Sequence, residues 1–297
     1  METIGQRELR SFLSESAGEN LREDDDTRRV SCSQVRKDNG VPVRDYLDLA
    51  QKVATVQFYN PDYIFLYRGQ AADYRRKRAT TLKPPIFRAP AGSSVSDQGI
   101  PTGDELTRRY DVLRRAEQLL LLRYPHRHGA QRLRRQRILR WAILQHYEVC
   151  DTPLLDVTQS LRIAAAFATI GADDRAFVYM LGLPNLSAAI TASAEAGLQV
   201  VRLSTACPPE ARRPHLQEGY LIGEYPDISD VSQKENYGLY EVDFGRRLVA
   251  KFCFDPQVFW VPGGPYPAIP REALYPDDGD ALVDLRNSIR SDLGLGS

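Results

Sequence analysis

The sequence predicts an α+β domain built on a mixed or split β-sheet, with arginine-rich helices packed on it. Three observations predict this class. Runs of β-branched and aromatic residues, typical of buried strands, recur along the chain. Between residues 104 and 144 the apolar positions follow helical spacing instead, and arginines occupy the outer faces. Helical spacing returns in the last stretch, from Gly279 to Leu293, which indicates a final amphipathic helix.

Composition limits the classes of protein to consider. The chain has 297 residues, of which 42% are hydrophobic, enough for a large core in one large domain or two small ones. A formal net charge of zero implies no global electrostatic steering of ligands. The four cysteines are isolated and lack metal-ligand spacing, so we predict no metal site. Neither a signal-peptide pattern nor an apolar run of membrane-span length is present, so we expect a cytoplasmic protein with no membrane partner.

The first 40 residues are mostly polar and differ from the rest of the chain. They include an acidic block from Glu23 to Asp26. We expect residues 1–40 to form a polar, partly disordered arm that contributes few apolar groups to the core. Residues 41–297 then form one domain. The acidic block complements the arginine-rich helices, so the arm is expected to dock on them or on a partner subunit.

The remaining elements follow from periodicity and from breaker residues. A stripe over Tyr46–Ala54 predicts a helix, and an Ala-rich segment predicts another over residues 185–199. Apolar or alternating runs predict strands at Tyr63–Tyr67, Ala176–Leu181, Leu239–Phe244 and Leu248–Phe254, and a turn into a strand over Gln217–Ile222.

The helical insertion at about residues 104–144 is strongly basic. Between Asp104 and Arg140 there are eleven arginines and only four acidic residues. A break near Tyr124 and Pro125 divides the stretch into two predicted helices. Two interpretations remain open for the arginine-rich faces: they are solvated helix surface, or they bind a nucleic acid or an acidic partner.

The stretch from Trp141 to Ala168 carries the densest polar cluster of the chain. His146, Asp156, Thr158 and Ser160 lie there between two apolar anchors. Asp156 and Thr158 share one face of an extended segment, and Ser160 precedes an Ala-rich helical run that it could cap. One interpretation is a buried structural network in which His146 bonds to Asp156. The other is a functional site.

Arg68 and Gly69 end the apolar run at Tyr63–Tyr67. An arginine that leaves a buried strand needs a counter-charge, so Arg68 binds an anion or pairs with an internal carboxylate such as Asp156. Glycine beside it permits close approach of a ligand or of backbone.

Together these motifs resemble the FRG-domain family, which is found in bacterial and phage-conflict proteins. The resemblance extends over roughly residues 40–290, with departures from the family pattern at Glu148, Leu154, Val157 and Leu161, where Gly, Arg, Trp and Pro are usual. It is carried, in order, by Tyr67-Arg68-Gly69-Gln70, Leu82-Lys83-Pro84-Pro85-Ile86-Phe87-Arg88, Gln145-His146-Tyr147, Thr152-Pro153-Leu154-Leu155-Asp156 with Thr158 and Ser160, Arg213 to Tyr220, and Leu274-Tyr275-Pro276-Asp277.

The order of these motifs is also similar to that in ADP-ribosyltransferases of the Arg–Ser–Glu type. That resemblance implies an ADP-ribosyltransferase-like fold with NAD as the substrate. It places Arg68, with Tyr67 and Gly69, at the phosphates and Thr158 with Ser160 at the ribose. Glu218 becomes the catalytic carboxylate, and Gln217 orients the acceptor.

The leading functional hypothesis is an NAD-dependent ADP-ribosyltransferase-like toxin or anti-phage defence effector, or an NAD glycohydrolase. Its partners would be a protein or nucleic-acid target and an antitoxin or other partner subunit. Two alternatives stay open: a nucleotide hydrolase that uses His146 and Asp156, and a non-catalytic module that binds nucleic acid or a partner. We expect Arg68, His146, Asp156 and Glu218 to converge on one cleft, because each lies at the edge of an apolar segment and needs partners there.

Overall fold

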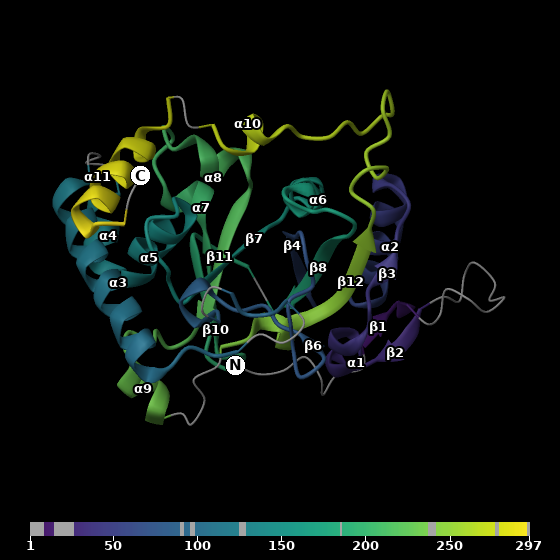
Figure 1. The fold of residues 1–297 in the computed structure, drawn as a ribbon, viewed down its shortest axis with the longest axis horizontal. Coiled ribbons are helices and arrows are strands. Elements are labelled where there is room, and N and C mark those ends of the chain that lie inside the picture. Colours follow the sequence, from purple (N-terminus) through teal and green to yellow (C-terminus); the bar gives the residue numbers. More distant parts are fainter. Residues whose placement is uncertain are drawn as a thin grey trace.

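The computed structural model describes residues 9–14, 27–89, 92–95, 99–124, 129–184, 186–236, 242–276 and 279–295. It confirms the predicted mixture of a large mixed sheet and several helices (Figure 1). None of the helices within these ranges is long and apolar enough to cross a membrane. Nor do the described His, Cys, Asp and Glu side chains gather anywhere in a group of three or more that could hold a metal ion.

An eight-stranded sheet forms the centre of the molecule, in the order β3-β12-β8-β4-β7-β11-β10-β9. Neighbouring strands are antiparallel, except that β12 runs parallel to β3, so the sheet is mixed. The strands are β3 (Val41–Pro42), β4 (Ile64–Gln70), β7 (Leu154–Thr158), β8 (Ala176–Leu183), β9 (Ile190–Ser193), β10 (Leu198–Arg202), β11 (Gly219–Glu224) and β12 (Leu248–Phe254). Two-stranded sheets form from β1 (Leu9–Ser11) with β2 (Arg28–Val30) and from β5 (Arg75–Arg76) with β6 (Ala79–Thr80).

The sheet opens between its two central strands. On one side β4 pairs with β8 along its whole length, from Ile64 to Gln70. On the other side β4 meets β7 at a single pair of residues, Tyr67 and Thr158. Beyond this pair the two strands diverge, so the end of β4 and the middle of β7 face a gap that side chains must fill.

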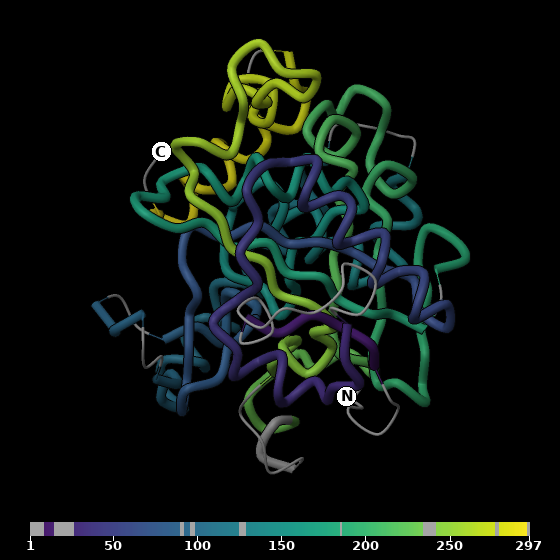
Figure 2. Tube along the Cα trace, turned by 90° about the vertical axis from the view of Figure 1, so that its right-hand side faces the viewer, coloured from purple at the N-terminus to yellow at the C-terminus, as the bar shows by residue number. Residues whose placement is uncertain are grey.

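Helices cover the sheet at both ends and above the opening (Figure 1). α3, α4, α5 and α11 gather at one end, α2 lies at the other, and α6 packs on β4 and β8. Figure 2 shows the molecule from the α2 end. The helices are α1 (Cys32–Lys37), α2 (Tyr46–Tyr59), α3 (Gly103–Arg123), α4 (Ala130–Arg135), α5 (Arg137–His146), α6 (Leu161–Thr169), α7 (Leu203–Ala206), α8 (Arg212–Leu216), α9 (Val231–Asn236), α10 (Arg271–Leu274) and α11 (Ala281–Leu293), with 3₁₀ turns at Pro85–Phe87 and Phe244–Arg247.

The arginine-rich insertion forms three helices, α3, α4 and α5, rather than the two expected. Many of its arginines already have acidic partners. Glu117, which is buried, accepts from both Arg137 and Arg140, and Glu105 accepts from Arg109. Arg123 pairs with Asp292 of α11. This pairing removes part of the positive charge that a nucleic-acid surface would need, and it favours the structural interpretation of these faces.

The N-terminal stretch differs from the arm that the sequence predicts. Leu9, Val30, Cys32 and Val35 are all buried in the main core. β1 and α1 pack against β12, at the opposite end of the molecule from α3 (Figure 1). The expectation that this stretch adds little to the core is therefore wrong for its described residues. The acidic block at residues 23–26 lies outside the described residues.

Two predicted elements also need correction. Residues 185–199 were expected to be helical, but the structure has the edge strand β9 and its neighbour β10 there, because the pairing of β9 with β10 and of β10 with β11 overrides the helix propensity of the alanines. Of the strand expected at 239–244, residues 239–241 lie outside the described part. Asp243 instead caps the turn at Phe244–Arg247, accepting from the backbone of Gly245.

Gly69 shows what the close packing of α6 on β4 requires. A Cβ atom at this position would lie 1.8 Å from the carbonyl oxygen of Ala164 and 2.6 Å from the nitrogen of Ala168. Gly69 therefore allows the backbone of α6 to pack closely on β4, and this packing explains the glycine without a ligand.

We predict that Gly69→Ala destabilises the protein by about 1–3 kcal/mol or more, because the backbone of α6 must move away from the sheet. Thermal unfolding followed by circular dichroism measures the change. Gly103→Ala is the matched control, since an added Cβ there meets nothing within 4 Å. Equal melting temperatures for the two variants would contradict the close-packing explanation.

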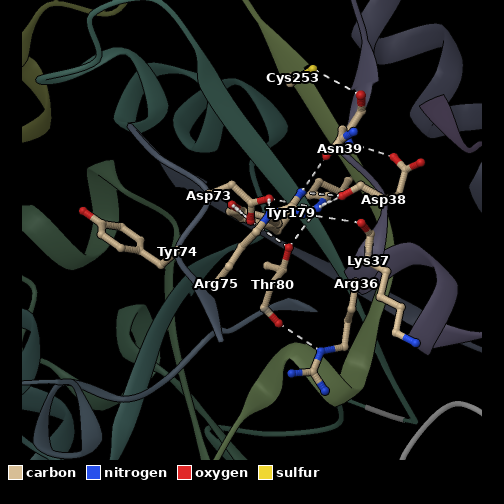
Figure 3. A network of polar contacts seen from close by, with 12 residues as sticks. Arg36, Lys37, Asp38, Asn39, Asp73, Tyr74, Arg75, Thr80, Tyr179 and Cys253 are labelled. Atoms are coloured by element: carbon tan, nitrogen blue, oxygen red, sulfur yellow. Dashed lines mark hydrogen bonds and ion pairs between the residues drawn. The ribbon is translucent and has the colours of Figure 1, made fainter. Parts of the chain in front are cut away.

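A buried polar network fixes the segment that follows β4 (Figure 3). Asp73 accepts hydrogen bonds from Arg75 Nε at 2.8 Å, Thr80 Oγ1 at 2.7 Å, Tyr179 Oη at 3.1 Å and Lys251 Nζ at 3.0 Å. Arg75 also donates to the carbonyl oxygen of Asp38 at 2.7 Å, which ties the N-terminal segment to the same point. Residues 71–80 are thus held between the N-terminal segment, β8 and β12.

Candidate functional site

A pocket of about 530 Å³ lies where β4 and β7 diverge. This volume falls within the range of roughly 300–1,000 Å³ that is usual for small-molecule sites. Its walls come from the end of β4, from α5 and the turn after it, from β7, from α6, and from the segment that leads into β11. Its polar lining residues include Arg68, Arg88, Gln145, His146, Glu148, Asp156, Thr158 and Gln217.

Arg68 is a half-buried cation that lines this pocket. Its Nη1 donates to the backbone carbonyl oxygen of Asp156 at 2.6 Å, and its Nε is buried without a hydrogen-bond partner among the described residues. No described carboxylate forms an ion pair with it, so the interpretation in which Arg68 pairs with the Asp156 carboxylate is not what the structure shows. Burial, and then the nearby Arg88, lower the pKa of Arg68 to about 10, which leaves the guanidinium protonated at neutral pH.

Asp156 is held from the opposite side by α5. Its Oδ2 accepts from Gln145 Nε2 at 2.8 Å, and its Oδ1 lies 3.4 Å from His146 Nδ1. Thr152 fixes Gln145 in turn, donating to its Oε1 at 3.0 Å. Burial raises the pKa of Asp156, but the His146 hydrogen bond and charge, Arg68 and Gln145 outweigh burial, and the net pKa lies below its usual range. The carboxylate is therefore ionised at neutral pH.

His146 sits behind this carboxylate. Its side chain is buried, and its Nε2 is shielded from solvent, with no hydrogen-bond partner among the residues described. Gly219 leaves room for the ring, since a Cβ there would lie 3.1 Å from His146 Cε1. The predicted bond between His146 and Asp156 is confirmed, and its geometry suits a histidine that orients a carboxylate.

Thr158 and Ser160 form the junction between β7 and α6. Thr158 Oγ1 donates to the carbonyl oxygen of Gln217 at 2.8 Å and accepts from the backbone of Ser160 at 3.0 Å. Ser160 caps α6 by accepting from the backbone of Ile163 at 3.4 Å, which confirms the predicted cap. Thr158 lines the pocket, as do Tyr67, Gly69 and Gln217, whereas Ser160 is not among the lining residues. Their assignment to NAD stays a prediction.

Glu218 does not join the cluster. Its side chain is exposed and is not among the pocket-lining residues, and its backbone has a φ of 44°, in the left-handed region. The expected convergence therefore holds for Arg68, His146 and Asp156 and is wrong for Glu218. A turn at this residue directs Gln217 and Gly219 to the pocket and Glu218 away from it.

Glu148 is a pocket residue that the sequence reasoning did not select. It occupies the position where glycine is usual in the resembling family, and its φ of 54° explains why that position favours glycine. Its carboxylate lies 3.9 Å from Arg213 Nη1 and 4.0 Å from Arg286 Nη2, with 56% of the side chain exposed. The departure from the family pattern at this position was the one feature of the sequence that could have pointed to Glu148 as a pocket residue.

Aromatic rings complete the pocket. Tyr67, Tyr74 and Tyr275 line it together with Phe167, whose ring meets that of Tyr275 edge to face at 5.8 Å. Aromatic walls of this kind pack against planar rings of ligands. The pocket therefore combines an arginine for an anion, an ionised carboxylate and surfaces for a base or a similar ring.

In the comparison with known families, residues 63–176 match the family model of the FRG domain. No curated protein and no solved structure matches the chain. The matched range includes most of the pocket, from the end of β4 through α5 and β7 to α6, while Gln217, Gly219 and Tyr275 lie outside it.

Proposed function

This chain contains an FRG domain at residues 63–176, and on that premise we propose that its pocket binds NAD and cleaves the bond between nicotinamide and ribose. The reaction is ADP-ribosyl transfer to a target, or to water as in an NAD glycohydrolase. The observation that carries the proposal is Arg68, a half-buried cation that lines the pocket, donates to the carbonyl oxygen of Asp156 and has no described carboxylate as an ion-pair partner. Because a half-buried charge without an ion-pair partner is costly, the pocket is suited to a bound anion.

The other pocket residues match the remaining parts of NAD. Cleavage of the nicotinamide bond builds positive charge at the anomeric carbon of the ribose, which a fixed carboxylate stabilises. Asp156 supplies an ionised carboxylate, held by Gln145 and His146. The rings of Tyr74 and Tyr275 offer surfaces for the nicotinamide or the adenine.

Glu148 is the second carboxylate, and we assign to it the role that sequence resemblance gave to Glu218. It lines the pocket, and its contacts with Arg213 and Arg286 are long, at 3.9 and 4.0 Å. Contacts of this length leave the carboxylate free to turn towards a ribose hydroxyl. Asp156 is less suited to that movement, because its two oxygens are already bonded to neighbours.

The hydrolase hypothesis has one observation in its favour, the pairing of His146 with Asp156 at 3.4 Å inside the pocket. A general base must also present its other nitrogen to water or substrate. His146 Nε2 is shielded from solvent, so the ring is better placed to orient Asp156 than to move a proton. We therefore rank nucleotide hydrolysis by His146 below cleavage of NAD.

At the level of the cell, the proposed activity fits a toxin or an anti-phage effector, which depletes NAD or modifies a protein or nucleic-acid target. A partner subunit would then act as its antitoxin. The non-catalytic alternative, binding of nucleic acid through α3–α5, is weakened by the ion pairs that those arginines already make.

Incubation with labelled NAD tests the proposal, with nicotinamide release measured alone and label transfer measured in cell lysate. We expect release by the wild-type protein, and a loss of about a hundredfold or more in Glu148→Gln, as for removal of a group that stabilises the transition state. Glu218→Gln is the matched control and should retain activity. Absence of both release and transfer contradicts the proposal, and loss in Glu218→Gln alone returns the carboxylate role to Glu218.

A further inference from the structure

Arg88 is a second guanidinium in the pocket, close enough to Arg68 for the two charges to interact. Its Nε donates to the carbonyl oxygen of Lys83 at 3.2 Å, which fixes the plane of the group. Its two terminal nitrogens have no hydrogen-bond partner among the described residues, and no described carboxylate lies within ion-pair distance of it. Arg88 is also exposed, so these nitrogens are available to a ligand.

Two neighbouring arginines that lack a described ion-pair partner are unfavourable. Each charge repels the other, and Arg68 is in addition half-buried. Asp156 reduces this cost, but its carboxylate oxygens are already bonded to Gln145 and His146. An anion that contacts both guanidinium groups would offset the repulsion at both positions at once.

The position of Arg88 indicates how far an anion must extend to contact both arginines. Arg88 lines the pocket and also a neighbouring hollow of about 950 Å³, with Gln145 and Glu148 on the shared boundary. Arg68, by contrast, belongs to the first pocket only. A ligand that meets both arginines therefore reaches from the buried part of the pocket to the boundary between the two hollows.

We propose that Arg68 and Arg88 together hold a diphosphate, with one phosphate on each guanidinium. Planar guanidinium groups bind phosphate oxygens with two parallel hydrogen bonds, which matches two arginines to two linked phosphates. The ligand class is a compound with an internal diphosphate, such as a dinucleotide or a nucleoside-diphosphate sugar. This inference rests on the proposed function of the same pocket, and it adds the residue that selects diphosphates over monophosphates.

Other cations nearby are less suited to this role. Arg108 and Arg109 line the second hollow, but both donate to Glu105, at 2.5 and 2.9 Å. Lys83 lines the first pocket, but its ammonium group already donates to the carbonyl oxygen of Gly99 at 3.2 Å.

Isothermal titration of the full chain with ADP-ribose, pyrophosphate, AMP and inorganic phosphate tests the proposed diphosphate clamp, which consists of Arg68 and Arg88. We expect ADP-ribose and pyrophosphate to bind more tightly than AMP and phosphate. Arg88→Ala should raise the Kd for ADP-ribose roughly ten- to a hundredfold, as for loss of charge-assisted hydrogen bonds, and should change the Kd for AMP much less. Arg88→Lys should recover only part of the loss, and Arg108→Ala is the matched control with unchanged binding.

Several outcomes would overturn the clamp: no binding of ADP-ribose or pyrophosphate to the wild-type protein, equal losses for AMP and ADP-ribose in Arg88→Ala, or the same Kd in Arg88→Ala as in the wild type. Thermal unfolding of each variant excludes misfolding as the cause. The result is separable from that of the proposed reaction. ADP-ribose binding that depends on Arg88, without nicotinamide release from NAD, supports the clamp and contradicts the reaction, while nicotinamide release that Arg88→Ala leaves unchanged does the opposite.

Discussion

Arg68→Ala should reduce nicotinamide release from NAD by about a hundredfold or more, the size of effect seen when a group that stabilises developing charge is removed. The melting temperature should change by only a few degrees. Two terms oppose each other in the folded protein. The variant loses the 2.6 Å hydrogen bond to the Asp156 carbonyl oxygen, at a cost of about 1–3 kcal/mol. It also loses a half-buried charge and its repulsion with Arg88, a gain that the lost attraction to Asp156 reduces.

Activity and thermal unfolding must be measured on the same preparations of this variant. Arg114→Ala is a suitable control, because Arg114 pairs with Asp111 on the surface of α3, away from the pocket, and both measurements should match the wild type. A protein that no longer folds after Arg68→Ala would assign Arg68 a structural role. Full activity in a folded variant would remove Arg68 from the site altogether.

The central strands could be predicted because their sequence pattern is strong. β4, β8 and β12 each carry a run of apolar residues, and in the structure β8 and β12 are buried along their whole length. The edge strand β9 and its neighbour β10 could not be predicted. The alanines in this part of the chain favour a helix, and only pairing within the sheet, of β9 with β10 and of β10 with β11, makes the segment extended.

The N-terminal contribution to the core escaped prediction for a similar reason. Leu9, Val30 and Val35 stand in a mostly polar part of the chain, and the strands that carry the first two are only three residues long. A segment this short has too few positions for a periodicity to be detected. Its position depends on contacts with β12, more than 200 positions along the sequence.

Of the four residues expected to converge on one cleft, three could be placed in the pocket from the sequence because they adjoin buried segments. Arg68, His146 and Asp156 adjoin apolar segments that must be inside, so their polar groups must share partners. Glu148 and Glu218 sit at turns, with φ angles of 54° and 44°. At a turn the backbone conformation decides which way a side chain points, and a single sequence does not reveal it for a residue other than glycine. Glu148 therefore lines the pocket although it was not expected there, whereas Glu218, which was expected there, does not.

The network around Asp73 is the second place where one substitution should have a large effect. Lys251 is almost completely buried, and Asp73 is its carboxylate partner, at 3.0 Å (Figure 3 shows Asp73 with its other partners). Asp73→Ala leaves that ammonium group buried without a counter-charge. We expect a loss of about 3–5 kcal/mol and a fall in melting temperature of roughly 6–20 °C.

Two further variants show whether the unpaired charge is the cause. The double substitution Asp73→Ala with Lys251→Met removes both charges and should recover most of the lost stability, because a buried pair can be replaced by apolar groups at little cost. Asp111→Ala breaks an exposed pair with Arg114 instead and should change stability by less than about 0.5 kcal/mol. A double variant no more stable than Asp73→Ala would show that packing or the hydrogen bonds to Tyr179 and Thr80 dominate.

The pH dependence of stability independently tests whether the unpaired ammonium group of Lys251 causes the loss of stability in Asp73→Ala. Burial already lowers the pKa of Lys251 below its ordinary value of 10.5, although Asp73 acts in the opposite direction. Without Asp73 the pKa of Lys251 in the folded state should fall further. Between that value and 10.5 the unfolded chain binds more protons than the folded one, so stability rises with pH. The deficit of Asp73→Ala relative to the wild type should therefore shrink as the pH is raised from 7 towards 10 in thermal or denaturant unfolding, whereas the double variant, which has no buried ammonium group, should show no such recovery.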